Sequence, residues 1–80
     1  MPSKAQKIFS LFARDLGRMR EEQGISREQI AVMASVSYST VRRFEEGDSD
    51  SLLVLAAEIN AIEWPGKWKA LEQLFEQMAN

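Results

Sequence analysis

The segment GISREQI, residues 24–30, constrains this chain more than any other feature of its sequence. Ser26 is followed by Gln29 at the spacing of a capping box, in which each side chain bonds the backbone amide of the other residue. The two isoleucines that flank this pair stand at the positions of a hydrophobic staple, which fixes the angle at which the chain enters a helix. The pattern predicts a short helix that begins at Arg27 and ends near residue 34 or 35.

The segment VSYSTV, residues 36–41, carries a second start signal directly afterwards. Ser37 can cap a further helix, and the valines on either side form a second staple. This helix is expected to run through Glu46, because Gly47 readily takes the left-handed conformation found at helix ends. Two capped helices separated by about three residues form a helix-turn-helix by geometry.

Apolar periodicity predicts three more helices in the rest of the chain. One spans Ala5–Gln23, another covers about Leu52 to Ile62, and the last follows Pro65, which suits the first turn of a helix. Their apolar stripes are Ile8, Phe9, Phe12, Leu16 and Met19 in the first, Leu52, Leu55, Ala56 and Ile59 in the second, and Trp68, Leu71, Leu74, Phe75 and Met78 in the third. No segment reads as a credible strand, so the sequence predicts an all-α protein of five helices.

The absence of cysteine and histidine removes whole classes of site. Disulfides, zinc fingers and imidazole-based catalysis are excluded together. A core built from 80 residues rarely supplies more than about 3–5 kcal/mol without a further stabilising device, which leaves oligomerisation or unusually good helix packing. Polar residues interrupt the first 19 residues before a signal peptide or a membrane span could form, so we expect a cytoplasmic protein without membrane association.

Charge is distributed unevenly along the chain. The net charge of −2 argues at first sight against nucleic acid, but residues 1–43 hold eight basic and four acidic residues, whereas residues 44–80 hold two basic and eight acidic ones. One basic half and one acidic half indicate two surfaces with different roles. The acidic half is most simply a solvated surface, and it could also receive a basic protein partner.

The order of motifs resembles that of the phage repressor and Cro-like helix-turn-helix regulators, often called the Xre family. The residues that carry the resemblance lie within about residues 14–60. They are Leu16, Arg20, GIS at 24–26, Ala31, VS at 36 and 37, Val41, and FEEG at 44–47. The resemblance implies a compact five-helix, lambda-repressor-like DNA-binding domain. We expect residues 1–62 to form this helix-turn-helix domain and residues 63–80 to form a C-terminal helix that belongs to the core, to a dimer interface, or to both.

The resemblance also assigns candidate DNA contacts residue by residue. Helical geometry agrees with it, because Val41 and Phe44 should point inward while the remaining face of the second short helix points outward. Arg42 is the candidate reader of guanine, whose O6 and N7 atoms match the guanidinium fork. The full candidate set is Arg27, Ser37, Tyr38, Ser39, Arg42 and Arg43, with Arg27 and Arg43 as phosphate anchors. Arg20 and Glu45 match an internal ion pair of the family.

Several alternatives stay open at this point. Val32 and Met33 are expected to lie under the C-terminal helix or the N-terminal extension, although an exposed partner site is the competing interpretation. The C-terminal apolar stripe of Trp64, Trp68, Leu71, Leu74, Phe75 and Met78 is interpreted either as core or as a two-fold dimer contact. We expect a homodimeric repressor of an inverted-repeat site on double-stranded DNA, with no cofactor, metal or catalytic site. The alternative is an antitoxin-like or adaptor protein whose fold mainly binds another protein.

Overall fold

Five helices connected by short loops make up the part of the chain that the computed structural model describes, residues 3–80. The helices are α1 (Lys4–Glu22), α2 (Arg27–Ala34), α3 (Tyr38–Glu45), α4 (Leu52–Ala61) and α5 (Lys67–Ala79). No strand is present among these residues. The predicted all-α fold of five helices with a helix-turn-helix is confirmed, and its helix bounds lie within one or two residues of the predicted ones.

The short helices begin where their capping residues placed them. The hydroxyl of Ser26 accepts from the amide of Gln29, and the Gln29 side chain accepts from the amide of Ser26, so the capping box is complete. Ser37 caps α3 by accepting from the amide of Thr40. Between the two helices, Ser35 takes the left-handed conformation with φ 56° and ψ 44°, a conformation that usually favours glycine or asparagine. The turn therefore closes without glycine.

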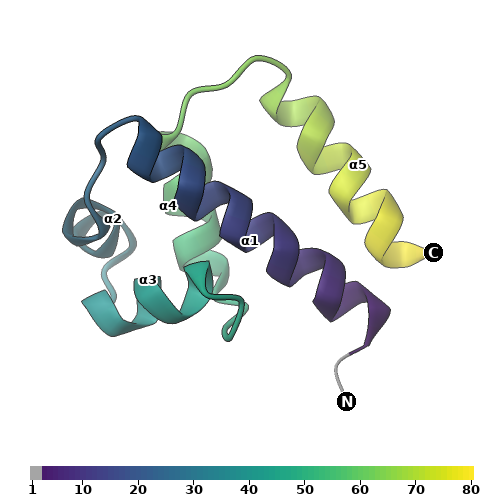
Figure 1. Cartoon of the computed structure of the whole chain (residues 1–80), viewed down its shortest axis with the longest axis horizontal. Helices are drawn as coiled ribbons and strands as arrows, with labels where there is room; N and C mark the ends of the chain where they lie inside the picture. Colours follow the sequence, from purple (N-terminus) through teal and green to yellow (C-terminus); the bar gives the residue numbers. More distant parts are fainter. Residues whose placement is uncertain (1–2) are drawn as a thin grey trace.

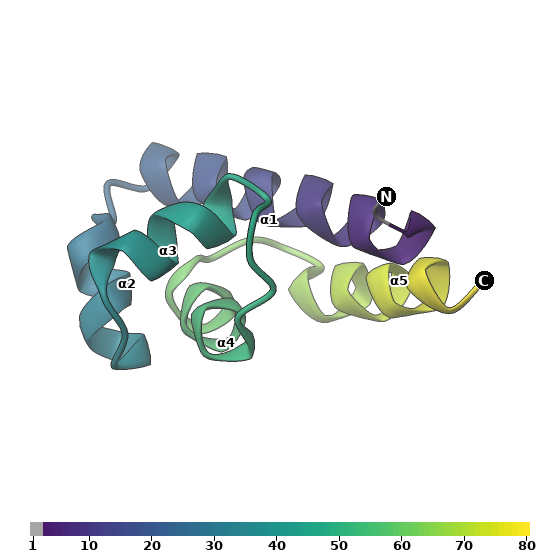
Figure 2. The same ribbon diagram turned by 90° about the horizontal axis from the view of Figure 1, so that it is seen from below.

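The long helix α1 organises the other four. Figure 1 shows α5 lying beside α1 in the antiparallel direction, with the start of α1 and the end of α5 on the same side of the molecule. The two views agree that α2, α3 and α4 gather around the C-terminal part of α1, away from the chain ends (Figure 2). The pairs α2 with α4, α1 with α3, and α2 with α3 are in contact. The two short helices are thus held between α1 and α4. Each is too short to be stable without these contacts.

The core draws on all of the first four helices. Leu16, Ile30, Val41, Phe44 and Val54 are fully buried in one apolar cluster. The Phe9 ring packs edge-on against Phe44, with ring centroids 5.8 Å apart. Because Phe9 belongs to α1 and Phe44 to α3, this contact fixes the inner face of the second short helix against the long helix.

The predicted inner face of α4 is confirmed at Leu55 and Ile59 and wrong at Leu52 and Ala56. Leu52 and Ala56 are exposed, and α4 buries the stripe Val54, Leu55, Ala57, Glu58 and Ile59. Leu52 starts the helix, where the chain arrives from the loop after α3, and its side chain is 73% exposed. The helix is apolar on almost every side, so periodicity alone could not select the buried face.

The expectation that other parts of the chain cover Val32 and Met33 is also wrong. Val32 is 79% exposed and Met33 is 52% exposed, because α5 packs along α1 rather than over α2. The division at residue 62 stays a prediction, and residues 1 and 2 of its first part lie outside the described residues. Ile62 is fully buried in the common core, so the segment that leads to α5 starts from within the helix-turn-helix region.

Candidate nucleic-acid interface

The outer face of α3 carries most of the predicted DNA contacts. Val41, Phe44 and Glu45 of this helix are buried, whereas Tyr38, Ser39, Arg42 and Arg43 are exposed. Of the predicted set only Arg27 comes from α2, and the structure brings it beside the first turn of α3. The predicted residues therefore lie on one side of the helix-turn-helix, with no other helix over them.

Arg20 and Glu45 form a buried, two-pronged ion pair that ties α1 to the end of α3. Nε and Nη2 of Arg20 donate to the two carboxylate oxygens of Glu45 at 2.7 and 3.0 Å. The remaining Nη1 donates to the carbonyl oxygen of Ile25 at 2.5 Å, just before the cap of α2. Both side chains are almost fully buried, with 7% and 3% of their surface exposed. One guanidinium thus fixes the position of both short helices relative to α1.

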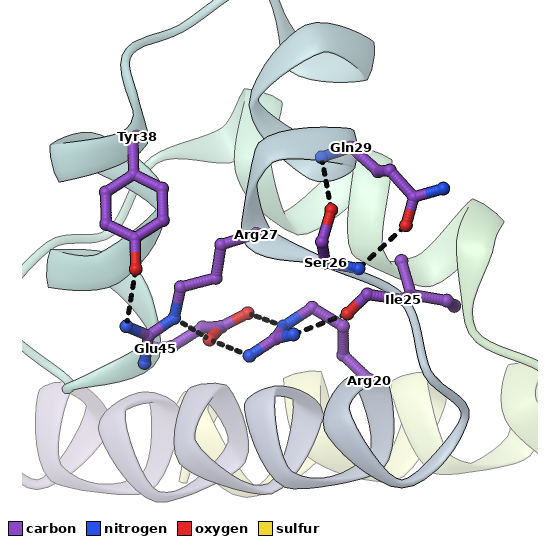
Figure 3. Close-up of polar contacts among 7 residues, drawn as sticks. All are labelled: Arg20, Ile25, Ser26, Arg27, Gln29, Tyr38 and Glu45. Carbon is purple, nitrogen blue, oxygen red and sulfur yellow. Dashed lines mark hydrogen bonds and ion pairs between the residues drawn. The ribbon is translucent and has the colours of Figure 1, made fainter.

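Arg27 shares the same carboxylate, as Figure 3 shows. Its Nε donates to Oε1 of Glu45 at 2.9 Å, and its Nη1 donates to the hydroxyl of Tyr38 at 3.4 Å. The guanidinium also lies over the Tyr38 ring, 6.0 Å from the centroid. The predicted phosphate anchor therefore uses two of its three nitrogens within the protein, and among the contacts of residues 3–80 its Nη2 is left for an outside acceptor.

The electrostatics of this cluster follow from its hydrogen bonds. Burial alone would raise the pKa of the Glu45 carboxyl, but the hydrogen bonds from Arg20, the interaction with Glu58 and the hydrogen bond from Arg27 together lower that pKa below its ordinary 4.5. The hydrogen bonds of Arg27 with Tyr38 and then Glu45 raise the pKa of its guanidinium. Glu45 is therefore a carboxylate and Arg27 a cation at neutral pH.

The sequence prediction missed Glu58, which lies beneath this cluster on α4. Its side chain is fully buried, and neither carboxyl oxygen has a hydrogen-bond donor among the described residues. Burial, followed by the interactions with Glu45, raises the pKa of Glu58 to about 9. Position 58 lies on the helical stripe formed by Val54, Leu55, Ile59 and Ile62. If the buried face of α4 had been chosen correctly, the sequence would have predicted a buried glutamate there.

The remaining predicted contacts differ in how freely they face the solvent. Arg42 pairs with Glu46 one turn later, with Nη1 3.4 Å from Oε1, and this pair is exposed on both sides. Exposed pairs of this kind contribute about 0–1 kcal/mol, so Arg42 leaves its partner at little cost. Ser37 is engaged as the cap of α3 and also bonds the hydroxyl of Thr40 at 2.9 Å, whereas Ser39 and Arg43 are exposed.

The structure divides the apolar stripe of the C-terminal segment between core and surface. Leu74 is 4% exposed, and Trp64 and Leu71 pack against the core cluster. Trp68 and Phe75 are instead 70% and 55% exposed. Phe75 and Met78 border a surface hollow between α1, the loop after α3, α4 and α5, together with Phe9, Leu52 and Leu55.

Comparison with known proteins agrees with this geometry. A family model described as a helix-turn-helix domain matches residues 11–62, which is more than half of the chain. No curated protein and no solved structure matches. Within residues 3–80, no helix is long and apolar enough to cross a membrane. The matched span begins within α1 and ends just after α4, so it contains the two capped helices and the buried ion pair that holds them, and the chain belongs to the helix-turn-helix domain family.

Proposed function

We propose that the protein is a sequence-specific DNA-binding regulator, and more narrowly a homodimeric repressor of an inverted-repeat site in the manner of the Xre family. In helix-turn-helix proteins the second short helix enters the major groove and the first crosses the DNA backbone. Here α3 is the recognition helix, with Arg42 reading guanine and Tyr38 contacting a thymine methyl group or a phosphate. Arg27 and Arg43 bind phosphates and set the register.

One observation carries the proposal. The carboxylate of Glu45 holds Arg20 from α1 and Arg27 from α2 together, so it locks the start of α2 against the end of α3. The exposed side of α3 meanwhile carries two arginines, a tyrosine and a serine that take no part in the core. A rigid inner face and a polar, basic outer face are what reading a groove requires.

A homodimer fits both the stability and the function of the domain. A single module of this size contacts only one half-site, and two modules related by a two-fold axis place their recognition helices about 34 Å apart, one turn of DNA. Trp68 and Phe75 are the large apolar side chains of α5 that the monomer leaves exposed. The hollow beside Phe75 contains apolar side chains from α1, α4 and α5 that a second copy can cover, next to the polar loop of residues 47–50.

Selection of bound duplexes from a random DNA pool by the purified protein, at two salt concentrations, tests the proposal. The expected result is an enriched inverted repeat, with binding that weakens as salt rises because phosphate contacts release counterions. The absence of any consensus, combined with loss of binding at moderate salt, would contradict sequence-specific regulation. An enriched single half-site would contradict the dimer alone.

A second function is favoured by one specific observation. Val32 and Met33 are consecutive residues of α2 and are both largely exposed, and residues 44–80 of the chain carry eight acidic residues. In an antitoxin-like or adaptor protein this surface would bind a protein partner, and the DNA-facing side of α3 would be secondary. Changing both residues to Ser should leave the selected DNA sequence unchanged if the first proposal holds.

A further inference from the structure

Glu58 occupies a position that strongly disfavours an ionised carboxylate. It is fully buried where α4 meets the ion-pair cluster, and its two oxygens accept no hydrogen bond from the described residues. Arg20 directs its nitrogens to Glu45 and to the carbonyl of Ile25, and Arg27 directs two of its own to Glu45 and Tyr38. Burial of a carboxylate with no donor is costly enough that the group takes up a proton instead.

The same contacts decide which carboxyl group of the pair holds the proton. Glu45 accepts three hydrogen bonds from the two arginines, and each of them favours its charged form. Glu58 receives none, and its interaction with Glu45 raises its pKa further. The charged groups that act on Glu58 are Glu45 from α3, Arg20 from α1 and Arg27 from α2. From the first turn of α5, Lys67 reaches the last turn of α4, where it donates to the carbonyl of Ile59.

We propose that Glu58 is a positioning residue: as a neutral carboxylic acid it donates a hydrogen bond to Glu45 and thereby holds Arg27 charged and in place for DNA. The neutral acid completes the set of donors around Glu45. It also determines the charge of the site, because two arginines and one carboxylate leave one positive charge in the cluster, whereas ionised Glu58 would cancel it. That remaining charge lies at the solvent side, where the Arg27 side chain is 28% exposed.

The inference rests on the proposed DNA-binding function only in its last step. The proton on Glu58 is a property of the folded domain and can be measured without DNA. The effect on Arg27 can be measured only with DNA, because the positive charge that neutral Glu58 leaves on the cluster acts on the phosphates of the DNA backbone. The test therefore has one arm for each step.

The first arm measures unfolding by urea as a function of pH for the wild type and for Glu58→Gln, whose neutral amide can replace the neutral acid as a donor. In the wild type the folded state holds one more proton than the unfolded state, so the unfolding constant should rise about tenfold per unit between about pH 6 and 8.5. Glu58→Gln should remove this slope and still fold. The exposed residue Glu76 serves as control, because Glu76→Gln should keep the wild-type slope.

Direct observation of the proton completes this arm. Glutamate labelled at its carboxyl carbon should give one NMR signal in the neutral-acid range at pH 7, and that signal should be absent in Glu58→Gln. No histidine or cysteine titrates in this window, because the chain contains neither. A carboxylate signal for Glu58 at pH 7, or an unfolding constant that is independent of pH in the wild type, would overturn the proposal.

The second arm measures binding to a mixed-sequence duplex at low salt by fluorescence anisotropy. Glu58→Gln should bind within about twofold of the wild type at pH 7. The wild type should lose about half of its affinity at pH 9, where about half of Glu58 is ionised, while Glu58→Gln should not. Equal pH dependence in both proteins would overturn the positioning role. If the wild type binds no duplex at all, the proposed function fails, and the first arm still decides whether Glu58 is protonated.

Discussion

Gly17 of α1 lies directly against the side chain of Glu45, so closely that a Cβ atom at position 17 would stand 3.0 Å from the Glu45 carboxyl carbon. Three arginine hydrogen bonds hold that carboxylate in place, which leaves it little room to move aside. We expect Gly17→Ala to be destabilising by about 1–2 kcal/mol, because overpacking costs about 1–3 kcal/mol and helix propensity returns up to about 1 kcal/mol. Urea unfolding followed by circular dichroism measures the change.

A double-mutant cycle separates these two effects. With Glu45→Gly as background, the three Glu45 side-chain atoms that lie nearest to a Cβ at position 17, including the Glu45 Cβ, are all removed, and Gly17→Ala should stabilise by about 0.5–1 kcal/mol through helix propensity alone. The sign of the Gly17→Ala effect should therefore reverse between the two backgrounds. An equal loss in both would show that position 17 is constrained by something other than Glu45.

Below about pH 4.5, the loss of stability with falling pH should come in part from protonation of Glu45. Its folded pKa lies below the ordinary 4.5, so the stability it contributes is complete above pH 4.5 and is lost as the pH falls through the lower folded value. Glu58 has the opposite sign, since its pKa is raised to about 9 and its contribution falls as the pH rises toward that value. Together the two groups should place maximal stability on the mildly acidic side of neutral.

Urea midpoints collected from about pH 3 to 9 test this expectation for the wild type. Glu45→Gln should be much less stable, by about 3–5 kcal/mol, because it leaves Arg20 buried without its counter-charge. A wild-type optimum at or above pH 8 would contradict the assignment of charges in the cluster. Glu76→Gln again serves as the exposed control.

Helix starts were predictable from the sequence because they depend on local contacts. The capping box of Ser26 with Gln29 and the cap at Ser37 lie within one turn each, and the structure contains both. The buried face of α4 was not predictable, because its apolar residues surround the helix and only packing selects among them. The proposed neutral state of Glu58 follows from its burial on this face, so sequence patterns could not predict it either.

The sequence predicted which residues of α3 face outward in the candidate site, but it did not predict all the hydrogen bonds and ion pairs that join them to other helices. The outward positions of α3 follow from helix period, and the structure exposes Tyr38, Ser39, Arg42 and Arg43. The sharing of one carboxylate by two arginines depends on the approach of α1, α2 and α3, which lie far apart in sequence. A resemblance to a family supplied one of the two arginine contacts, and the tertiary structure supplied the second.

Arg42 and Arg43 should differ in how their loss affects DNA binding. Arg42→Ala should relax base choice at one position of each half-site, with a loss of about 1–3 kcal/mol of discrimination. Arg43→Ala should weaken binding to all sequences alike and reduce the salt slope by about one unit. Repeating the duplex selection with both variants compares them directly, and uniform weakening by Arg42→Ala would contradict its role as the reader.

The two neighbours Leu74 and Phe75 should separate folding from association. Leu74 is 4% exposed, so Leu74→Ala should cost about 2–5 kcal/mol of unfolding free energy through the cavity it leaves. Phe75 is 55% exposed, and burial of such a ring contributes about 1.5–3 kcal/mol, so Phe75→Lys should weaken the dimer roughly tenfold or more and leave the fold intact.

Sedimentation equilibrium measures association, and urea unfolding of the dissociated protein measures stability. Gln77→Lys adds the same charge to α5 on the side away from the Phe75 hollow and should change neither quantity. A wild-type protein that stays monomeric at high concentration, or a Phe75→Lys variant that associates as well as the wild type, would show that this face of α5 is not the contact between copies.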